Sequence, residues 1–174
     1  MNAITPSLKP ALPLELFNEA IARVNEWRGR CLDGFARAEM AVAECLAAMS
    51  EAGDKAPRVG PPQLVGQRYE VLAAAIAAGG PFAAQAGGVA SVLERFRAHH
   101  DLRNMLAHGV GRVTLDRSGR WTVVLKVMTS RGGRACHDAM ALTEREAEEI
   151  GTEVGRLSQV LCSQLGQLRS RIGR

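Results

Sequence analysis

A run of apolar side chains at helical spacing is the feature that most constrains the fold of this 174-residue chain. Between Leu14 and Met49, apolar residues recur every three or four positions, and only Arg28 interrupts the series. Because this spacing is that of one face of an α-helix, it predicts a long amphipathic helix that ends near the sequence EAGDKAPRVGPP at 51–62. The stripe consists of Leu14, Phe17, Ile21, Val24, Cys31, Phe35, Ala38, Val42, Cys45 and Met49.

Two shorter helices are expected in the middle of the chain. The alanine-rich residues 63–78 have a helical composition, and the Gly-Gly-Pro sequence that follows them is a helix breaker. A third helix is expected from about Ala90 as far as Gly109, because glycine favours the end of a helix. Residues 1–12 contain two prolines and no apolar period, so we expect a loose N-terminal arm.

The last third of the chain changes period twice. Residues 110–142 alternate apolar and polar side chains, with turn sequences DRSG at 116–119 and SRGG at 130–133, which predicts a three-stranded antiparallel meander. Thr143 and Glu146 then form a capping box, so a final helix is expected to begin there. The apolar stripe of that helix is Ile150, Val154, Leu157, Leu161, Leu165, Leu168 and Ile172.

These patterns predict a mainly α fold, a four-helix bundle with a small antiparallel β-meander inserted between helices 3 and 4. The length fits one domain over residues 1–174. We find no apolar run long enough to span a membrane and no N-terminal signal pattern, which favours a cytoplasmic protein without a membrane partner. The cysteines have no C-x-x-C spacing and are expected to be reduced thiols, most of them in the core: Cys31, Cys45, Cys136 and Cys162.

Polar chemistry is concentrated in the stretch HHDLRNMLAHGVGR at 99–112. On a helix, His100, Asn104 and His108 lie four residues apart along one face, and Arg103 lies beside that face. The helix end after this face leaves backbone carbonyls unpaired. We therefore expect a donor-rich site at the end of the third helix.

Three interpretations of this cluster follow from the residues alone. In a structural interpretation, Arg103 pairs with Asp101 or Glu94, and His108 caps the helix. In a metal interpretation, His100 and His108 would share an ion, but no strong carboxylate or thiolate ligand completes the set, so neither a metal nor another cofactor is expected.

The third interpretation is cleavage of RNA. A histidine with a pKa near neutrality can take the proton from a ribose 2′-hydroxyl, and a permanently charged arginine can stabilise the anionic phosphorane that forms next. The formal net charge of +4 permits contact with a phosphate backbone. Arg103 and His108 are the candidates for these two roles, and Asn104 can orient either the histidine or the phosphate.

The segment RNMLAH, from Arg103 to His108, resembles the signature of the HEPN superfamily. That signature is an arginine, commonly followed by a polar residue such as asparagine, and a histidine after four to six further positions, on a helix of an all-α bundle. The resemblance implies a metal-independent endoribonuclease, often the toxin or effector of a defence system and opposed by an antitoxin-like partner. It also implies that two motifs meet across a homodimer, with Arg103 and His108 catalytic and Asn104 supporting.

Several residues outside the RNMLAH motif are assigned supporting or structural roles. His99, His100 and Glu39 are candidate supporting residues, and Glu39 could either orient Arg103 or His108 from the first helix or face solvent. The segment Arg68 to Glu70, including Tyr69, is expected on the solvent face rather than in the lining of a cleft. Trp121 is expected to pack the sheet against the bundle rather than to stack on a base, and His137 and Asp138 are expected at an exposed strand edge.

A second function class remains open beside the nuclease. HEPN-like domains also occur as inactive modules that bind ligands or partners. In that alternative, the chain is a non-enzymatic helical interaction module, the long first and last helices form a dimer, and the Arg/His cluster only ties the fold together.

Overall fold

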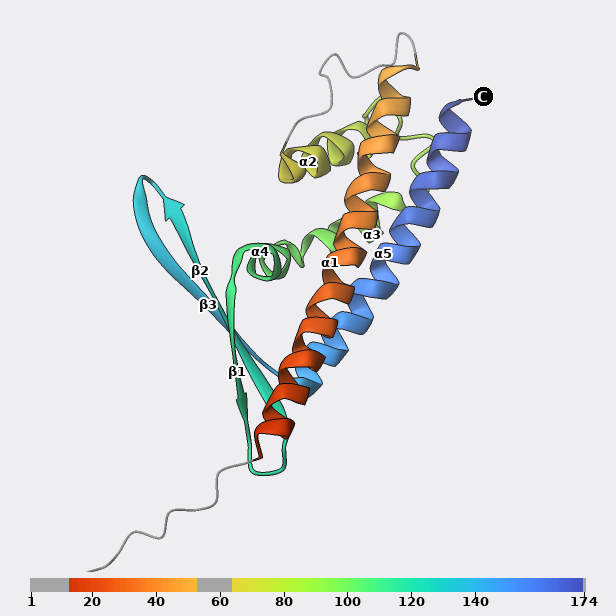
Figure 1. The fold of residues 1–174 in the computed structure, drawn as a ribbon. Coiled ribbons are helices and arrows are strands. Elements are labelled where there is room, and N and C mark those ends of the chain that lie inside the picture. Colours follow the sequence, from red (N-terminus) through yellow and green to blue (C-terminus); the bar gives the residue numbers. More distant parts are fainter. Residues whose placement is uncertain (1–12, 53–63, 174) are drawn as a thin grey trace, which may run out of the picture.

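The computed structural model describes residues 13–52 and 64–173 (Figure 1), so the predicted loose arm and the start of the second helix at Gln63 lie outside it. Within the described ranges, the chain forms five helices and one three-stranded antiparallel sheet. The mainly helical class with a sheet inserted before the last helix is therefore confirmed. The elements are α1 (Leu14–Ser50), α2 (Val65–Ile76), α3 (Val89–Arg97), α4 (His100–His108), β1 (Val110–Leu115), β2 (Trp121–Arg131), β3 (Arg134–Thr143) and α5 (Glu144–Ile172).

The two longest helices, α1 and α5, run parallel and side by side (Figure 1). We call the contact between these two helices the α1–α5 seam. The predicted stripes are largely buried from Val24 to Met49 on α1 and from Val154 to Leu168 on α5, and the fully buried side chains include Val42, Leu157 and Leu161. Leu14 and Phe17, at the start of the predicted α1 stripe, are 69% and 37% exposed. The predicted capping box is present, because the Thr143 hydroxyl accepts from the Glu146 backbone and the Glu146 carboxylate accepts from the Thr143 backbone. The seam is the axis on which the other elements pack.

The third predicted helix is two helices, α3 and α4, because the chain turns at Ala98 and His99. The buried stripe of α3 ends at Phe96, and its helical continuation would bury polar side chains at His100 and Arg103. The turn changes the phase, so that α4 buries Leu102, Met105 and Leu106 instead. The prediction of four helices was wrong for this reason.

The sheet has the order β1-β2-β3, as the meander predicts. Trp121, Val123 and Leu125 face the helices and are almost fully buried, and the Trp121 ring lies 6.2 Å from that of Trp27. This confirms the packing role expected for Trp121. The strand β2 extends to Arg131, inside the predicted SRGG turn at 130–133, and so continues beyond Lys126, the last residue that pairs with β1.

Beyond Lys126, β2 pairs with β3 alone. Residues 127–138 form this two-stranded part, which we call the hairpin extension, and it projects away from the helices (Figure 1). Its turn contains Gly132 and Gly133, whose φ angles of +58° and +76° favour glycine.

Candidate functional site

Arg103 projects from α4 towards α1, where it pairs with Glu39. The Arg103 Nε lies 2.9 Å from Glu39 Oε1, and a terminal guanidinium nitrogen lies 3.4 Å from Glu39 Oε2. The two side chains are only 23% and 17% exposed. This fork-like geometry fixes the guanidinium plane, and it shows that Glu39 faces the cluster rather than open solvent.

His100 and Asn104 form a polar pair on the surface of α4. The Asn104 amide nitrogen lies 3.0 Å from Nε2 of His100, which accepts this hydrogen bond in its neutral form. His100 is exposed, and Asn104 is half-buried. The predicted row of polar side chains along α4 is therefore present at these two positions.

His108 is the last residue of α4, and its side chain is exposed. An α-helix turns about 100° per residue, so His108 leaves the helix about 140° away from Arg103. The Arg103 side chain contacts Glu39 of α1, whereas His108 is the last residue of α4. The two residues of the motif therefore share a helix without sharing a direction.

The end of α4 is capped by Arg28, not by His108 as the structural interpretation proposed. The Arg28 Nε donates to the Leu106 carbonyl at 2.6 Å, and its terminal nitrogen donates to the Gly109 carbonyl at 3.2 Å. Arg28 is the residue that interrupts the apolar stripe of α1. That interruption was the sequence signal for a polar contact inside the fold.

His99 lies in the turn between α3 and α4 and is directed to α5. Its Nε2 lies 3.8 Å from a carboxylate oxygen of Glu153, and its backbone carbonyl accepts from the Arg103 amide at 3.0 Å. His99 thus shapes the start of α4, and its side chain contacts Glu153 of α5.

Tyr69 belongs to the surroundings of the Arg103–Glu39 pair, and the expectation that it faces solvent was wrong. It is 5% exposed, and within the described chain its hydroxyl has no hydrogen-bond partner. Burial and the nearby Glu39 carboxylate raise the pKa of Tyr69 well above its ordinary value, and Arg103 opposes this shift. The signal for burial was that Tyr69, Leu72 and Ile76 follow one another at three- and four-residue steps, and all three are buried.

A pocket of about 370 Å³ lies beside this cluster, between α2 and α3. His100 is part of its wall, together with Tyr69, Glu70 and Arg97. Arg97 lies 4.0 Å from a Glu70 carboxylate oxygen, so the wall carries an ion pair as well as a histidine. Arg103 is not among the lining residues, so this pocket does not unite the predicted catalytic pair.

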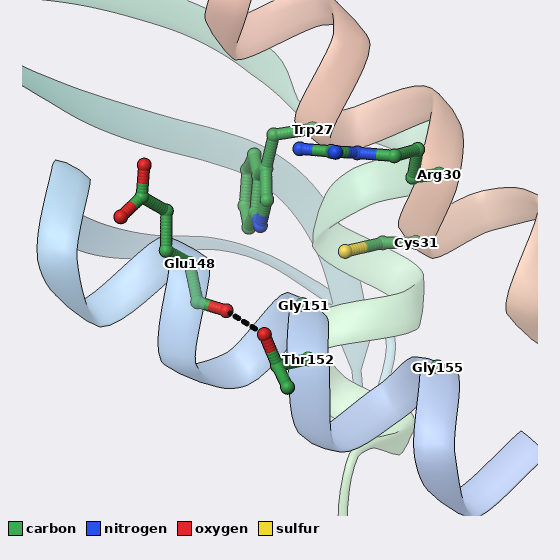
Figure 2. A pocket seen from close by; sticks show the side chains of 7 residues that line it. All are labelled: Trp27, Arg30, Cys31, Glu148, Gly151, Thr152 and Gly155. Carbon is green, nitrogen blue, oxygen red and sulfur yellow. Dashed lines mark hydrogen bonds between the residues drawn. The ribbon is translucent and has the colours of Figure 1, made fainter.

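A larger pocket of about 500 Å³ opens between α1 and α5 (Figure 2). Trp27 and Cys31 line it from α1, and Gly151 and Thr152 line it from α5, where the Thr152 hydroxyl donates to the Glu148 carbonyl at 2.8 Å. Burial raises the pKa of the Cys31 thiol to about 11, although Arg30 opposes the shift. A thiol in that state is a weak nucleophile, so the pocket contains no activated cysteine.

Within residues 13–52 and 64–173, no three His, Cys, Asp or Glu side chains are grouped so that they could hold a metal ion. None of the helices described above has an apolar stretch long enough to cross a lipid bilayer. Comparison of the chain with protein-family models, with curated proteins and with solved structures found no match.

Proposed function

We propose that this chain is a HEPN-like domain that binds RNA and cleaves it without a metal cofactor, through Arg103 and His108. The observation that carries the proposal is the fixed guanidinium of Arg103, which Glu39 holds by the Nε edge while 23% of the side chain stays exposed. A guanidinium held in this way keeps further N–H donors for a phosphate oxygen.

His108 supplies the base in this proposal. Its imidazole takes the proton from a ribose 2′-hydroxyl, and the freed oxygen forms a bond to the adjacent phosphorus. The bond from phosphorus to the 5′-oxygen then breaks, and the imidazolium returns its proton to that leaving oxygen. Arg103 stabilises the charge on the phosphorane between the two steps. The products are a 2′,3′-cyclic phosphate and a 5′-hydroxyl.

The geometry of α4 favours a site made by two copies. Arg103 and His108 leave the helix about 140° apart, so one copy alone does not aim both at the same phosphate. In a homodimer that brings two α4 ends together, His108 of one copy reaches the phosphate bound by Arg103 of the other. The exposure of His108 at the helix end leaves it accessible for this role.

The test is cleavage of a mixed RNA by the purified full chain in the presence of a chelator. His108→Ala is expected to reduce the cleavage rate about 100-fold or more, which is the usual contribution of a general base. Arg103→Lys keeps the positive charge but loses the planar pair of guanidinium N–H donors, so it should also reduce the cleavage rate. The matched control is Arg95→Gln on the exposed surface of α3, which should cleave at the wild-type rate.

Equal cleavage by the wild type, His108→Ala and Arg103→Lys would rule out this catalytic site, as would the absence of any cleavage by the wild type. Analytical ultracentrifugation of the same samples tests the dimer. A wild type that cleaves RNA while it is entirely monomeric would contradict the two-copy arrangement and leave the chemistry in place.

A second candidate function is the non-enzymatic helical interaction module. The observation that favours it is that two half-buried arginine contacts join α4 to α1. Arg103 of α4 pairs with Glu39 of α1, and Arg28 of α1 caps the end of α4. Thermal unfolding separates the candidates. A merely structural cluster loses stability in Arg103→Lys and Glu39→Gln with no RNA phenotype, whereas a catalytic His108 can be removed with little change in Tm.

A further inference from the structure

The face of the sheet that points away from the helices is basic and uncovered. The strand register places Arg112 opposite Val124, Val110 opposite Lys126, and Met128 opposite His137. Because paired residues point to the same side of a sheet, these side chains share the face opposite to the buried Val123. Arg112, Lys126 and His137 are all exposed. We call this surface the outer sheet face.

No carboxylate on the same face of the strands balances the charges of Arg112 and Lys126. Asp138 is the one acidic residue in β1, β2 and β3. Its register partner is Val127, so it lies on the opposite, inner side, where it accepts a hydrogen bond from the Thr129 hydroxyl at 3.0 Å. The outer sheet face therefore carries positive charge alone, which suits a polyanion.

Protection of a sheet edge does not account for the charge of Lys126. Lysines on edge strands prevent unwanted pairing between sheets. Lys126, however, lies on β2, the central strand, where both neighbours are already paired. The exposed charge of Lys126 is therefore a property of the outer sheet face and not a device that protects a sheet edge.

Exposed apolar side chains surround Lys126 on the same face. Val110, directly opposite, is 77% exposed, and Met128, two residues along β2, is 69% exposed. A duplex presents mainly phosphates to such a surface, whereas a single strand also presents unstacked bases that can contact apolar groups. Moreover, Val110 follows His108 by two residues, so the outer sheet face begins next to the predicted base.

We propose that the outer sheet face binds single-stranded RNA, with phosphates at Arg112 and Lys126 and bases against Val110 and Met128. This inference rests on the proposed function and deepens it, because it assigns the surface that delivers RNA to His108. Binding here is electrostatic and depends on salt, and it is separate from the chemistry at Arg103.

The experiment measures binding of a fluorescent, unstructured RNA oligonucleotide to the full-length chain by anisotropy, between about 50 and 200 mM salt. The variant is Arg112→Gln/Lys126→Gln. The matched control, Arg37→Gln/Arg156→Gln, removes the same charge from exposed positions on α1 and α5. Far-UV circular dichroism checks that both variants keep the helical content of the wild type. Duplex RNA of the same length and polyglutamate serve as alternative ligands.

Two lost phosphate contacts should reduce the slope of log K against log salt by about 1.4, which corresponds to about 25-fold weaker binding near 0.1 M salt. The control double variant should bind within about twofold of the wild type, because its charges lie away from the RNA. This pattern, together with weaker binding of duplex RNA and of polyglutamate, supports the outer sheet face as the binding surface. If the bound RNA is never cleaved, that result counts only against the proposed catalysis.

Wild-type affinity in Arg112→Gln/Lys126→Gln would overturn the outer sheet face and leave the proposed function standing, with RNA bound elsewhere. An equal loss in the control variant, or equal binding of polyglutamate, would overturn it too, because binding would then follow only the net charge. A wild type that does not bind RNA at the lowest salt would overturn both proposals.

Discussion

The α1–α5 seam and the hairpin extension differ in how they are held. In the seam, Val42, Leu157 and Leu161 are fully buried between two long helices. In the hairpin extension, Met128 is 69% exposed, and Thr129 on the inner side is only half-buried. A two-stranded hairpin is marginally stable by itself. The difference teaches that the seam is held by fully buried packing, whereas the side chains of the hairpin extension are more exposed to solvent.

The largest expected effect separates these two regions directly. Leu161→Ala in the seam should reduce the free energy of unfolding by about 2 to 5 kcal/mol, because it leaves a cavity in a fully buried position. Met128→Ala in the hairpin extension should change it by no more than about 0.5 kcal/mol. Urea unfolding followed by circular dichroism measures both, and similar losses in the two variants would contradict the comparison.

The next effect concerns the contact that ties α4 to the seam. Arg28→Ala removes two charge-assisted hydrogen bonds to the end of α4 and should cost about 2 kcal/mol of unfolding free energy. Arg30→Ala is the control, because Arg30 is 69% exposed and has only a long ion pair with Glu26, worth about 0.5 kcal/mol or less. Hydrogen exchange should show faster exchange of the last α4 amides in Arg28→Ala alone. Equal stability of the two variants would refute the capping role.

Two glycines of α5 sharpen the comparison within the seam. A Cβ at Gly155 would have no atom within 4 Å, so Gly155→Ala should stabilise the chain by up to about 1 kcal/mol through helix propensity. A Cβ at Gly151 would lie 3.1 Å from the Trp27 ring, so the strain of overpacking should outweigh the same gain and leave a net loss of about 1 kcal/mol. Thermal unfolding measures both. A stabilising Gly151→Ala would mean that Trp27 is free to shift.

The strongest periods in the sequence predicted the two long helices and the sheet, because a long stripe admits one helical face and a strict alternation admits one strand register. The third helix was mispredicted for a reason that the sequence contains. Phe96 and Leu102 are six positions apart, which on one straight helix places their side chains about 120° from each other. A single helix that buried both Phe96 and Leu102 would have to rotate its buried face between them. The turn at Ala98 and His99, between α3 and α4, produces this rotation.

The sequence named the polar residues of this cluster but left their partners open, including whether Glu39 orients Arg103 or faces solvent. Glu39 and Arg103 are 64 positions apart, and only the packing of α4 on α1 selects Glu39 over the nearer Asp101 and Glu94. The capping role of Arg28 depends on the same packing. By contrast, the angle of about 140° between Arg103 and His108 follows from helix geometry alone, because five positions separate them on one helix. The homodimer was implied only by the resemblance of RNMLAH to the HEPN signature.

The smallest expected effect lies at the turn between β1 and β2. The Ser118 hydroxyl and the Arg120 backbone amide donate to the Asp116 carboxylate and lower its pKa from 3.8 to about 2. A lowered pKa means that this contribution to stability is complete above about pH 4 and is lost as the pH falls towards 2. Asp116→Asn lacks the charge, so its Tm should lie below that of the wild type by a constant gap above pH 5, and that gap should close between about pH 4 and pH 2. Other carboxylates titrate in both proteins and cancel in the difference. A gap that persists unchanged to pH 2 would show that the Asp116 carboxylate does not hold this end of the sheet, which would then depend on packing against the seam alone.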